Sequence, residues 1–266
     1  MDFRGRGAAI AFILAAPIPA QASAWNPEPW HGELITSFVE TTATRGVDEF
    51  GREVELDVYR KRTSQNYGIA GLTKRIALVG AFDWQDAQIV GPSLDVSFRA
   101  PSKMEAGLQY QLHRTDRRAV AVSVSYLAGA DLPAALLTLE GRRDRVELRG
   151  LWGENYRMFG RDGFVEGQLA GRMELGGRIS GSRAQLSAGL KPFARTEVIL
   201  KARYARQESG LFERLELRSQ QRWEAEALAS LNLWKGAFLE VGYQGTVAAD
   251  NAVLEHGFKL GTWTKF

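Results

Sequence analysis

Apolar and polar residues alternate along most of the chain after about residue 25. Between residues 104 and 112, the even positions are Met, Ala, Leu, Tyr and Leu, whereas the odd positions are Glu, Gly and two Gln. Successive side chains of a strand point to opposite faces, so this period of two predicts a strand with one apolar and one polar face. We predict twelve such strands, at residues 32–44, 60–72, 75–86, 103–113, 119–128, 145–155, 163–174, 183–191, 196–206, 213–233, 237–247 and 254–266.

The connections between these strands alternate in length. Short connections are expected at residues 73–74, 114–118, 156–162, 192–195 and 234–236. The connections at the other end tend to be longer, at residues 45–59, 87–102 and 129–144, with shorter ones near residues 175–182, 207–212 and 248–253. Short turns at one end, long loops at the other and an even strand number are typical of outer-membrane barrels, whereas a soluble sandwich has no reason to alternate its loops. The sequence predicts an all-β fold, a single antiparallel transmembrane β-barrel of about 12 strands, with a range of about 10–14 because residues 132–140 can add a hairpin.

The beginning of the chain has the pattern of a secretory signal peptide. Two arginines precede an apolar stretch at residues 8–16, and small residues follow. This order predicts export and cleavage after Ala22 or Ala24. The apolar stretch is shorter than the roughly 20 residues of a membrane-spanning helix. We therefore divide the chain into a signal peptide at residues 1–24 and an outer-membrane barrel at residues 25–266.

Composition excludes several classes of function. The chain has 34 Lys and Arg against 31 Asp and Glu, and this net charge of +3 is too balanced for a protein that binds nucleic acid by neutralising phosphates. Cysteine is absent, so disulfides, thiolate metal sites and a cysteine nucleophile are excluded. We expect no cofactor, no metal site and no nucleic-acid partner.

The last predicted strand ends at an aromatic residue. Phe258 and Phe266 share one face of this strand, and lysines occupy the other. A terminal Phe behind an alternating strand and a signal peptide resembles the signature by which the barrel-assembly machinery of Gram-negative bacteria recognises outer-membrane proteins. The resemblance covers residues 25–266 and implies insertion by that machinery, with Phe266 as the assembly signal. Thr264 departs from the signature, because an aromatic or apolar residue is common at that position.

A second resemblance rests on the general layout of the chain. A strand that begins directly after residues 25–32, an extended connection at residues 48–59 and a spacing of twelve strands are similar to proteobacterial barrels of the phenol-degradation MetA-pathway type. Those barrels are regarded as transporters. The resemblance therefore implies transport across the outer membrane.

We predict no catalytic residue. The three histidines are His31, His113 and His256, and neither of the last two has a nearby Ser in sequence that it could activate. Asp83 and Asp86 are the nearest candidates for a carboxylate pair that activates water. A lipid-modifying or proteolytic outer-membrane enzyme is therefore the weakest of our hypotheses.

Two basic clusters lie in or beside predicted connections, at residues 114–118 and 142–145. In the predicted orientation they fall on opposite sides of the membrane. The outer cluster at residues 142–145 can contact the phosphates of lipopolysaccharide through charge-assisted hydrogen bonds. Outer-membrane lipids and lipopolysaccharide are therefore expected partners, together with small solutes.

The polar face of the strands carries the candidate functional residues. Charges of both signs can flank a water-filled path, or they can pair with one another and close it. The favoured hypothesis is a channel or passive transporter for small solutes, and the alternative is a structural or surface-interaction barrel with a plugged lumen. The residues predicted to line the lumen are Glu105, Gln109, Glu147, Arg149, Glu166, Arg172, Lys201, Arg203, Arg218, Arg222 and Glu240.

Overall fold

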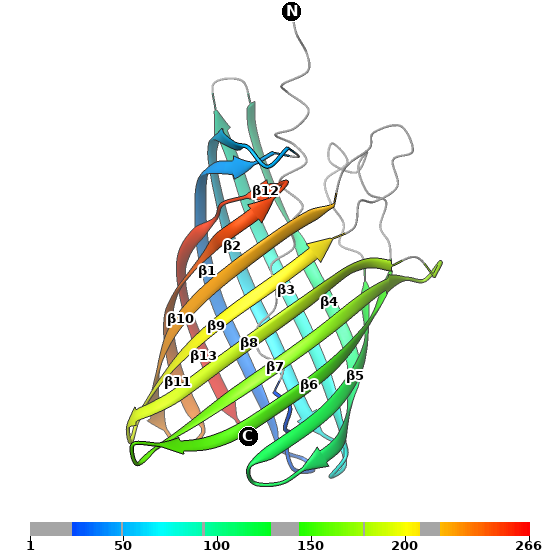
Figure 1. Cartoon of the computed structure of the whole chain (residues 1–266), viewed down its shortest axis with the longest axis vertical. Coiled ribbons are helices and arrows are strands. Elements are labelled where there is room, and N and C mark those ends of the chain that lie inside the picture. Colours follow the sequence, from blue (N-terminus) through cyan, green and yellow to red (C-terminus); the bar gives the residue numbers. More distant parts are fainter. Residues whose placement is uncertain (1–22, 49, 92–93, 129–143, 178, 208–218) are drawn as a thin grey trace, which may run out of the picture.

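The computed structural model is a closed antiparallel β-barrel of twelve long strands and one very short strand, β12 (Figure 1). It describes residues 23–48, 50–91, 94–128, 144–177, 179–207 and 219–266, and this part of the chain contains no helix. The strands are β1 (Gly32–Val47), β2 (Glu53–Gly71), β3 (Ile76–Gly91), β4 (Leu94–Arg114), β5 (Arg118–Ala128), β6 (Arg145–Met158), β7 (Arg161–Glu174), β8 (Ile179–Phe193), β9 (Thr196–Gln207), β10 (Gln220–Trp234), β11 (Ala237–Asp250), β12 (Ala252–Val253) and β13 (His256–Lys265).

The barrel closes between its first and last long strands. β1 pairs with β2 on one side and with β13 on the other, so every long strand has two neighbours and the barrel has no open edge. At the end of this seam, the backbone groups of Gly32 and Phe266 exchange two hydrogen bonds of 2.8 and 3.0 Å. A Cβ at Gly32 would lie 2.6 Å from Cζ of Phe266, so this close approach requires glycine.

The apolar face of the strands points outward. On β5, Val122, Val124 and Tyr126 are exposed, whereas Ser123 and Ser125 between them are buried. A soluble sandwich would cover its apolar side chains with a second sheet, but here they form the outer surface of a closed barrel. This arrangement confirms the prediction of a barrel. None of the described residues forms a helix long and apolar enough to cross a membrane.

The five connections that were predicted to be short lie together at one end of the barrel. One of them is the two-residue turn between β6 and β7, in which Phe159 and Gly160 have φ angles of +53° and +73°. Such positive φ angles match the right-handed twist of a hairpin. We take this end as the periplasmic end, because outer-membrane barrels place their short turns there.

The expected long loops at residues 45–59 and 87–102 are largely strands, so this part of the sequence prediction was wrong. β1 and β2 leave only residues 48–52 between them, and β3 and β4 leave only residues 92–93. The period-two pattern in fact continues in these arms, since Val54, Leu56 and Val58 alternate with Glu53, Glu55 and Asp57, and the backbone pairing of β1 with β2 extends to Val47 and Glu53. The described residues do not include most of the predicted loop at 129–144, with its candidate hairpin, or residues 213–218. Of the predicted loop, only Asp144 is described.

Exposed aromatic side chains lie at the periplasmic end along the part of the wall from β1 through β13 to β6. Five of them are between 62% and 92% exposed and lie at or beside turns and chain ends. Amphipathic and aromatic rings are enriched at the level of lipid headgroups, so these five side chains mark one boundary of the membrane. They are Trp30, Phe159, Phe193, Trp234 and Phe266.

Candidate functional site in the barrel interior

Ten of the eleven predicted lumen residues point into the barrel, on the same face as the other buried positions of their strands. The eleventh, Arg218, lies outside the described residues. The interior also holds charged residues that the predicted lumen lining did not include, among them Lys61, Asp83, Lys103, Arg183, Glu224, Glu226, Glu255 and Lys259. Each of them lies at an inward position of the alternating pattern, so the sequence pattern could have identified them.

One group of inward charges spans strands β4 to β8, and we call it the β4–β8 cluster (Lys103, Glu105, Glu147, Arg149, Arg172 and Arg183). Glu147 forms ion pairs with Arg149, Arg172 and Arg183, and the pair with Arg172 measures 2.6 Å. Glu105 pairs with Arg149 and, at 2.6 Å, with Lys103. Glu147 therefore holds three guanidinium groups together inside the barrel.

A second group lies across strands β9 to β13, and we call it the β9–β13 cluster (Lys201, Arg203, Arg222, Glu224, Glu226 and Lys259). Glu226 contacts Arg203, receives a hydrogen bond of 3.0 Å from Nζ of Lys259 and lies 3.7 Å from Nζ of Lys201. Arg222 and Glu224 form a 3.1 Å pair farther from the periplasmic end. Glu226 thus has the role in this cluster that Glu147 has in the first.

A smaller buried pair lies nearer the outer end of the interior. Glu255, in the link between β12 and β13, pairs with Lys61 of β2 and accepts a 3.0 Å hydrogen bond from Oγ1 of Thr41. The link thus brings a carboxylate to the lysine and compensates its charge.

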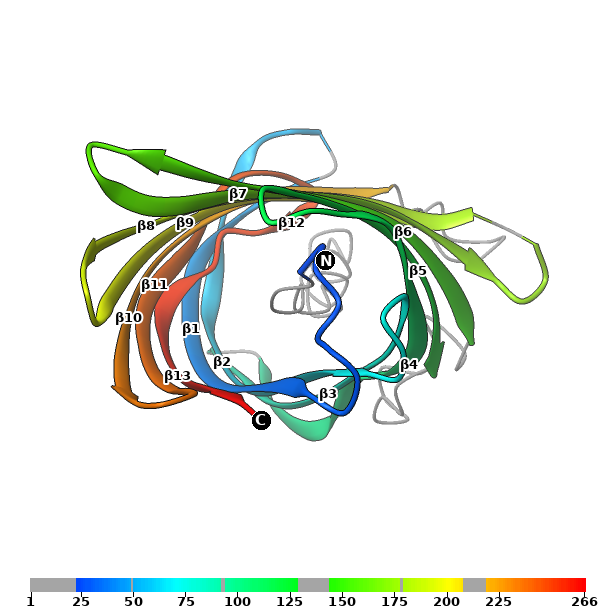
Figure 2. The same ribbon diagram turned by 90° about the horizontal axis from the view of Figure 1, so that it is seen from below.

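The N-terminal segment (residues 23–29) enters the periplasmic end of the barrel (Figure 2). The backbone N–H of Asn26 donates to Oε1 of Gln111 at 2.8 Å, and Nε2 of Gln109 donates to Oδ1 of Asn26 at 2.9 Å. Arg114 donates to the carbonyl of Asn26 at 2.8 Å and pairs with Glu28 at 2.9 Å. These bonds hold the segment inside the ring of strands, where the sequence pattern placed only lumen-lining residues.

Trp25 packs where the interior wall is made of small and apolar residues. It lies against a cluster that includes Ile35, Ile69, Val79 and Leu151. Gly153 provides the space for its ring, because a Cβ at that position would lie 2.2 Å from Cζ3 of the indole. The glycine thus fixes where the segment can lie.

We expect Gly153→Leu to destabilise the barrel by about 1–3 kcal/mol, because the added side chain overlaps the indole of Trp25. The measurement is the urea midpoint of the barrel refolded in detergent. Gly150→Leu is the control, since a Cβ at Gly150 meets no atom within 4 Å. Equal midpoints for the two variants would contradict this account of Gly153.

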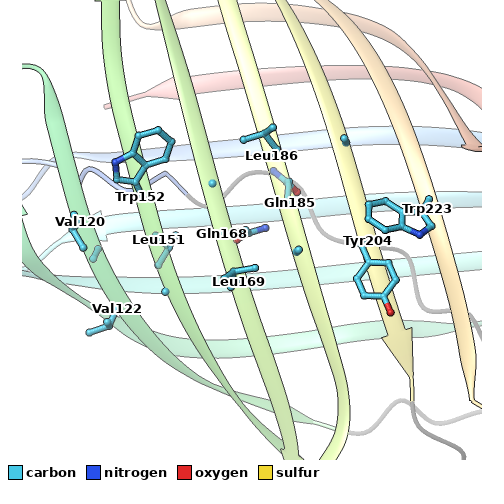
Figure 3. Close-up of a pocket in the computed structure, with 15 residues that line it drawn as sticks. Val120, Val122, Leu151, Trp152, Gln168, Leu169, Gln185, Leu186, Tyr204 and Trp223 are labelled. Atoms are coloured by element: carbon cyan, nitrogen blue, oxygen red, sulfur yellow. The ribbon is translucent and has the colours of Figure 1, made fainter.

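An apolar groove of about 600 Å³ crosses the outward face from β5 to β10 (Figure 3). Trp152 and Trp223 stand at its two sides, with Leu169 and Leu186 between them. The groove belongs to the apolar outer surface, so we expect lipid chains to fill it in a membrane. It therefore adds nothing to the polar interior.

The residues considered for catalysis do not come together. His31, His113 and His256 are all exposed and lie at different places on the barrel. Asp83 points inward, whereas Asp86 is on the opposite face, where it pairs with Arg99 at 2.6 Å. The described residues contain no group of three His, Cys, Asp or Glu that could hold a metal ion.

The tip between β1 and β2 is organised by one aspartate outside the membrane. Oδ1 of Asp48 accepts hydrogen bonds of 2.9 Å from the backbone N–H groups of Phe50 and Arg52, and the Arg52 guanidinium lies 2.8 Å from Oδ2. Desolvation raises the pKa of Asp48, but these hydrogen bonds outweigh it and hold the pKa below its usual value. Arg52 thus serves as the counter-charge of Asp48 in a structural turn.

Comparison with solved structures gives a clear result for the fold. The COG4313 outer membrane channel from Pseudomonas putida F1 superposes with a TM-score of 0.70 at 12% identity, over 93% of this chain and 100% of that chain. The protein has the outer-membrane β-barrel fold. The translocator domain of the autotransporter NalP from Neisseria meningitidis (12% identity, 90% of each chain) and the NanC porin (7% identity, 86% of this chain and 100% of that chain) both give a TM-score of 0.50.

Comparison of the sequence with family models and with curated proteins gives no match. The structural similarities, all at or below 12% identity, therefore describe the fold, and this fold supports a location in the outer membrane. The predicted resemblance to outer-membrane barrels is confirmed at this level. The resemblance to the MetA-pathway type, the cleavage of the leader and the role of Phe266 in assembly stay predictions.

Proposed function

We propose that the protein is a passive outer-membrane channel through which small polar solutes diffuse past the two charge clusters. The observation that carries the proposal is the inward placement of these clusters in a closed barrel whose outer surface is apolar. A barrel with a purely structural role can fill its interior with uncharged side chains at lower desolvation cost. The superposition on an outer-membrane channel and on a porin supports the proposal.

Each of the two clusters carries more cationic than acidic side chains. Each cluster contains four cationic side chains and two carboxylates. Asp83 and Glu240 are also buried in the interior and interact electrostatically with Lys103 and with Lys201, respectively. When the inward Lys61, Glu166, Glu197 and Glu255 are also counted, nine cations face nine carboxylates among the described residues, so the surplus of cations is confined to the two clusters. Charges that line a pore tune its selectivity.

The reversal potential of a single barrel in a KCl gradient across a planar bilayer tests the proposal. We expect Arg172→Gln to shift this potential toward cation preference, because Arg172 is the most accessible cation of the β4–β8 cluster. Arg157→Gln is the control, since Arg157 is exposed beside the β6–β7 turn. A correctly folded barrel that passes no current would refute the channel.

One observation favours the alternative of a plugged lumen. The N-terminal segment is bound inside the periplasmic end by Gln109, Gln111 and Arg114. If this segment stays in place, the barrel is a closed scaffold, and the function would be binding by the strand ends and loops on the outer side of the membrane. The same bilayer measurement separates the two proposals, because a scaffold conducts nothing under any gradient.

A further inference from the structure

The structure distinguishes between the two cleavage positions that the sequence leaves open. Small residues in the A-x-A pattern precede both candidate bonds, as Ala20-Gln21-Ala22 and as Ala22-Ser23-Ala24. Cleavage after Ala22 keeps Ser23 and Ala24 in the mature protein, whereas cleavage after Ala24 removes them. The contacts of these two residues therefore bear on where the mature chain begins.

Ser23 and Ala24 are integrated into the interior of the barrel. The carbonyl of Ser23 accepts a 2.9 Å hydrogen bond from Nε2 of Gln109, and the carbonyl of Ala24 accepts one of 2.9 Å from Nε2 of Gln111. Ala24 is 1% exposed and belongs to the apolar cluster around Trp25. Residues of a discarded leader have no reason to fit the mature barrel in this way.

Glu166 gives the second and independent observation. Its carboxylate accepts a 3.1 Å hydrogen bond from Oγ of Ser23, and across the described part of the chain no Lys or Arg pairs with it. The nearby acidic groups Glu33 and Glu197 repel its charge, and Lys201 is the cation whose field reaches it. A carboxylate inside a barrel needs a close counter-charge, because its desolvation is otherwise uncompensated.

The α-nitrogen of Ser23 is in the right place to supply that charge. Three covalent bonds separate it from Oγ of the same residue, so the two atoms are about 2.5–3.7 Å apart in any rotamer. Since Oγ lies 3.1 Å from Oε1 of Glu166, this nitrogen is within about 7 Å of the carboxylate, and rotation of the Ser23 and Glu166 side chains and of the terminal backbone can bring an ammonium group there into ion-pair range. Within a longer chain the same nitrogen is an uncharged amide.

We propose that a signal peptidase hydrolyses the bond between Ala22 and Ser23, and that the new α-ammonium group of Ser23 pairs with Glu166 inside the barrel. Water adds across the peptide bond, leaving a carboxylate on Ala22 and an ammonium group on Ser23. The inference rests on export of the chain and is independent of the proposed channel function. Processing then completes the interior, because only the cleaved chain carries the counter-charge of Glu166.

The first test is the N-terminus of the protein purified from the outer membrane of a Gram-negative host that expresses the full chain. We expect intact mass and N-terminal sequencing to show Ser23 as the first residue. A mature chain that begins at Trp25, or one that retains the leader, overturns the proposal.

The second test follows the reactivity of the Ser23 α-amine in the folded wild-type barrel in detergent. An amine-specific reagent is applied over a range of pH, and the N-terminal peptide is quantified by mass spectrometry. The ion pair is expected to raise the pKa of this amine above its ordinary value of about 7.7–8.0. An amine that titrates at its ordinary value overturns the ion pair, even if cleavage occurs after Ala22.

Variants show whether Glu166 is the partner. Glu166→Gln is expected to return the titration of the Ser23 amine toward the ordinary range, whereas Glu154→Gln leaves it unchanged. Glu154 lies on the outward face of β6 and pairs with Arg118. An equal effect of both variants refutes the assignment of Glu166. If Glu166→Gln does not fold, the wild-type titration decides alone.

Discussion

Glu147→Gln is expected to lower the free energy of unfolding by about 3–5 kcal/mol, because it removes one partner of buried ion pairs and leaves the others uncompensated. The Glu147 carboxylate is fully buried and contacts Arg149, Arg172 and Arg183. Without its charge, Arg172 and Arg183 lose the only acidic partner that the structure gives them among the described residues, and the three guanidinium groups repel one another. The measurement is urea unfolding of the refolded barrel in detergent, followed by tryptophan fluorescence and by the heat-dependent shift of gel mobility.

The matched control is Glu154→Gln, on the same strand β6. Glu154 pairs with Arg118 at 3.1 Å, but the two side chains are 33% and 64% exposed, so we expect a loss below about 1 kcal/mol. Adding Arg183→Met to Glu147→Gln is expected to recover part of the stability by removing one of the repelling charges. Similar losses for the two single variants would contradict a central role for Glu147.

The sequence was sufficient to predict the barrel because membrane insertion imposes a strict alternation. In β5, the outward Val and Tyr face lipid and the inward Ser residues do not, so each position indicates its side of the wall. The arm at residues 53–58 also alternates, with Val54, Leu56 and Val58 between Glu53, Glu55 and Asp57, so the pattern was present where we predicted a loop.

The same alternation placed the candidate residues on the inward face but could not show how they pair. Glu226 of β10 bonds to Lys259 of β13, with β11 between them, and Glu147 meets Arg183 two strands away. Such contacts depend on the stagger of the strands around the barrel, which one strand's sequence does not contain. The N-terminal segment was missed for another reason, because it has no periodicity. A glycine at an inward position, such as Gly153, can indicate that another part of the chain approaches the barrel wall closely there. This was the sequence signal for the packing of Trp25.

Removal of the N-terminal segment is expected to raise the single-channel conductance several-fold. The segment occupies the periplasmic end of the interior, and it is held there by the side chains of Gln109, Gln111 and Arg114 and by the packing of Trp25 against the wall. A chain refolded from residue 30 onward keeps every long strand, including the seam between Gly32 and Phe266. The ion path then loses the backbone and side chains that cross its periplasmic end, and pore conductance depends on this cross-section.

The measurement compares the conductance of three proteins in a planar bilayer: the full mature chain, the chain that begins at residue 30, and the Trp25→Ala variant. Only folded barrels, identified by the heat-dependent gel shift, are used. Trp25→Ala removes the largest side chain of the segment but keeps the polar contacts of Asn26, so we expect an intermediate conductance. A segment that plugs the barrel completely gives no current in the full chain and a measurable current after truncation, which favours the scaffold over the channel. Equal conductance of the full and truncated chains would mean that the ion path does not pass the segment, and the account of the interior given above would then be wrong.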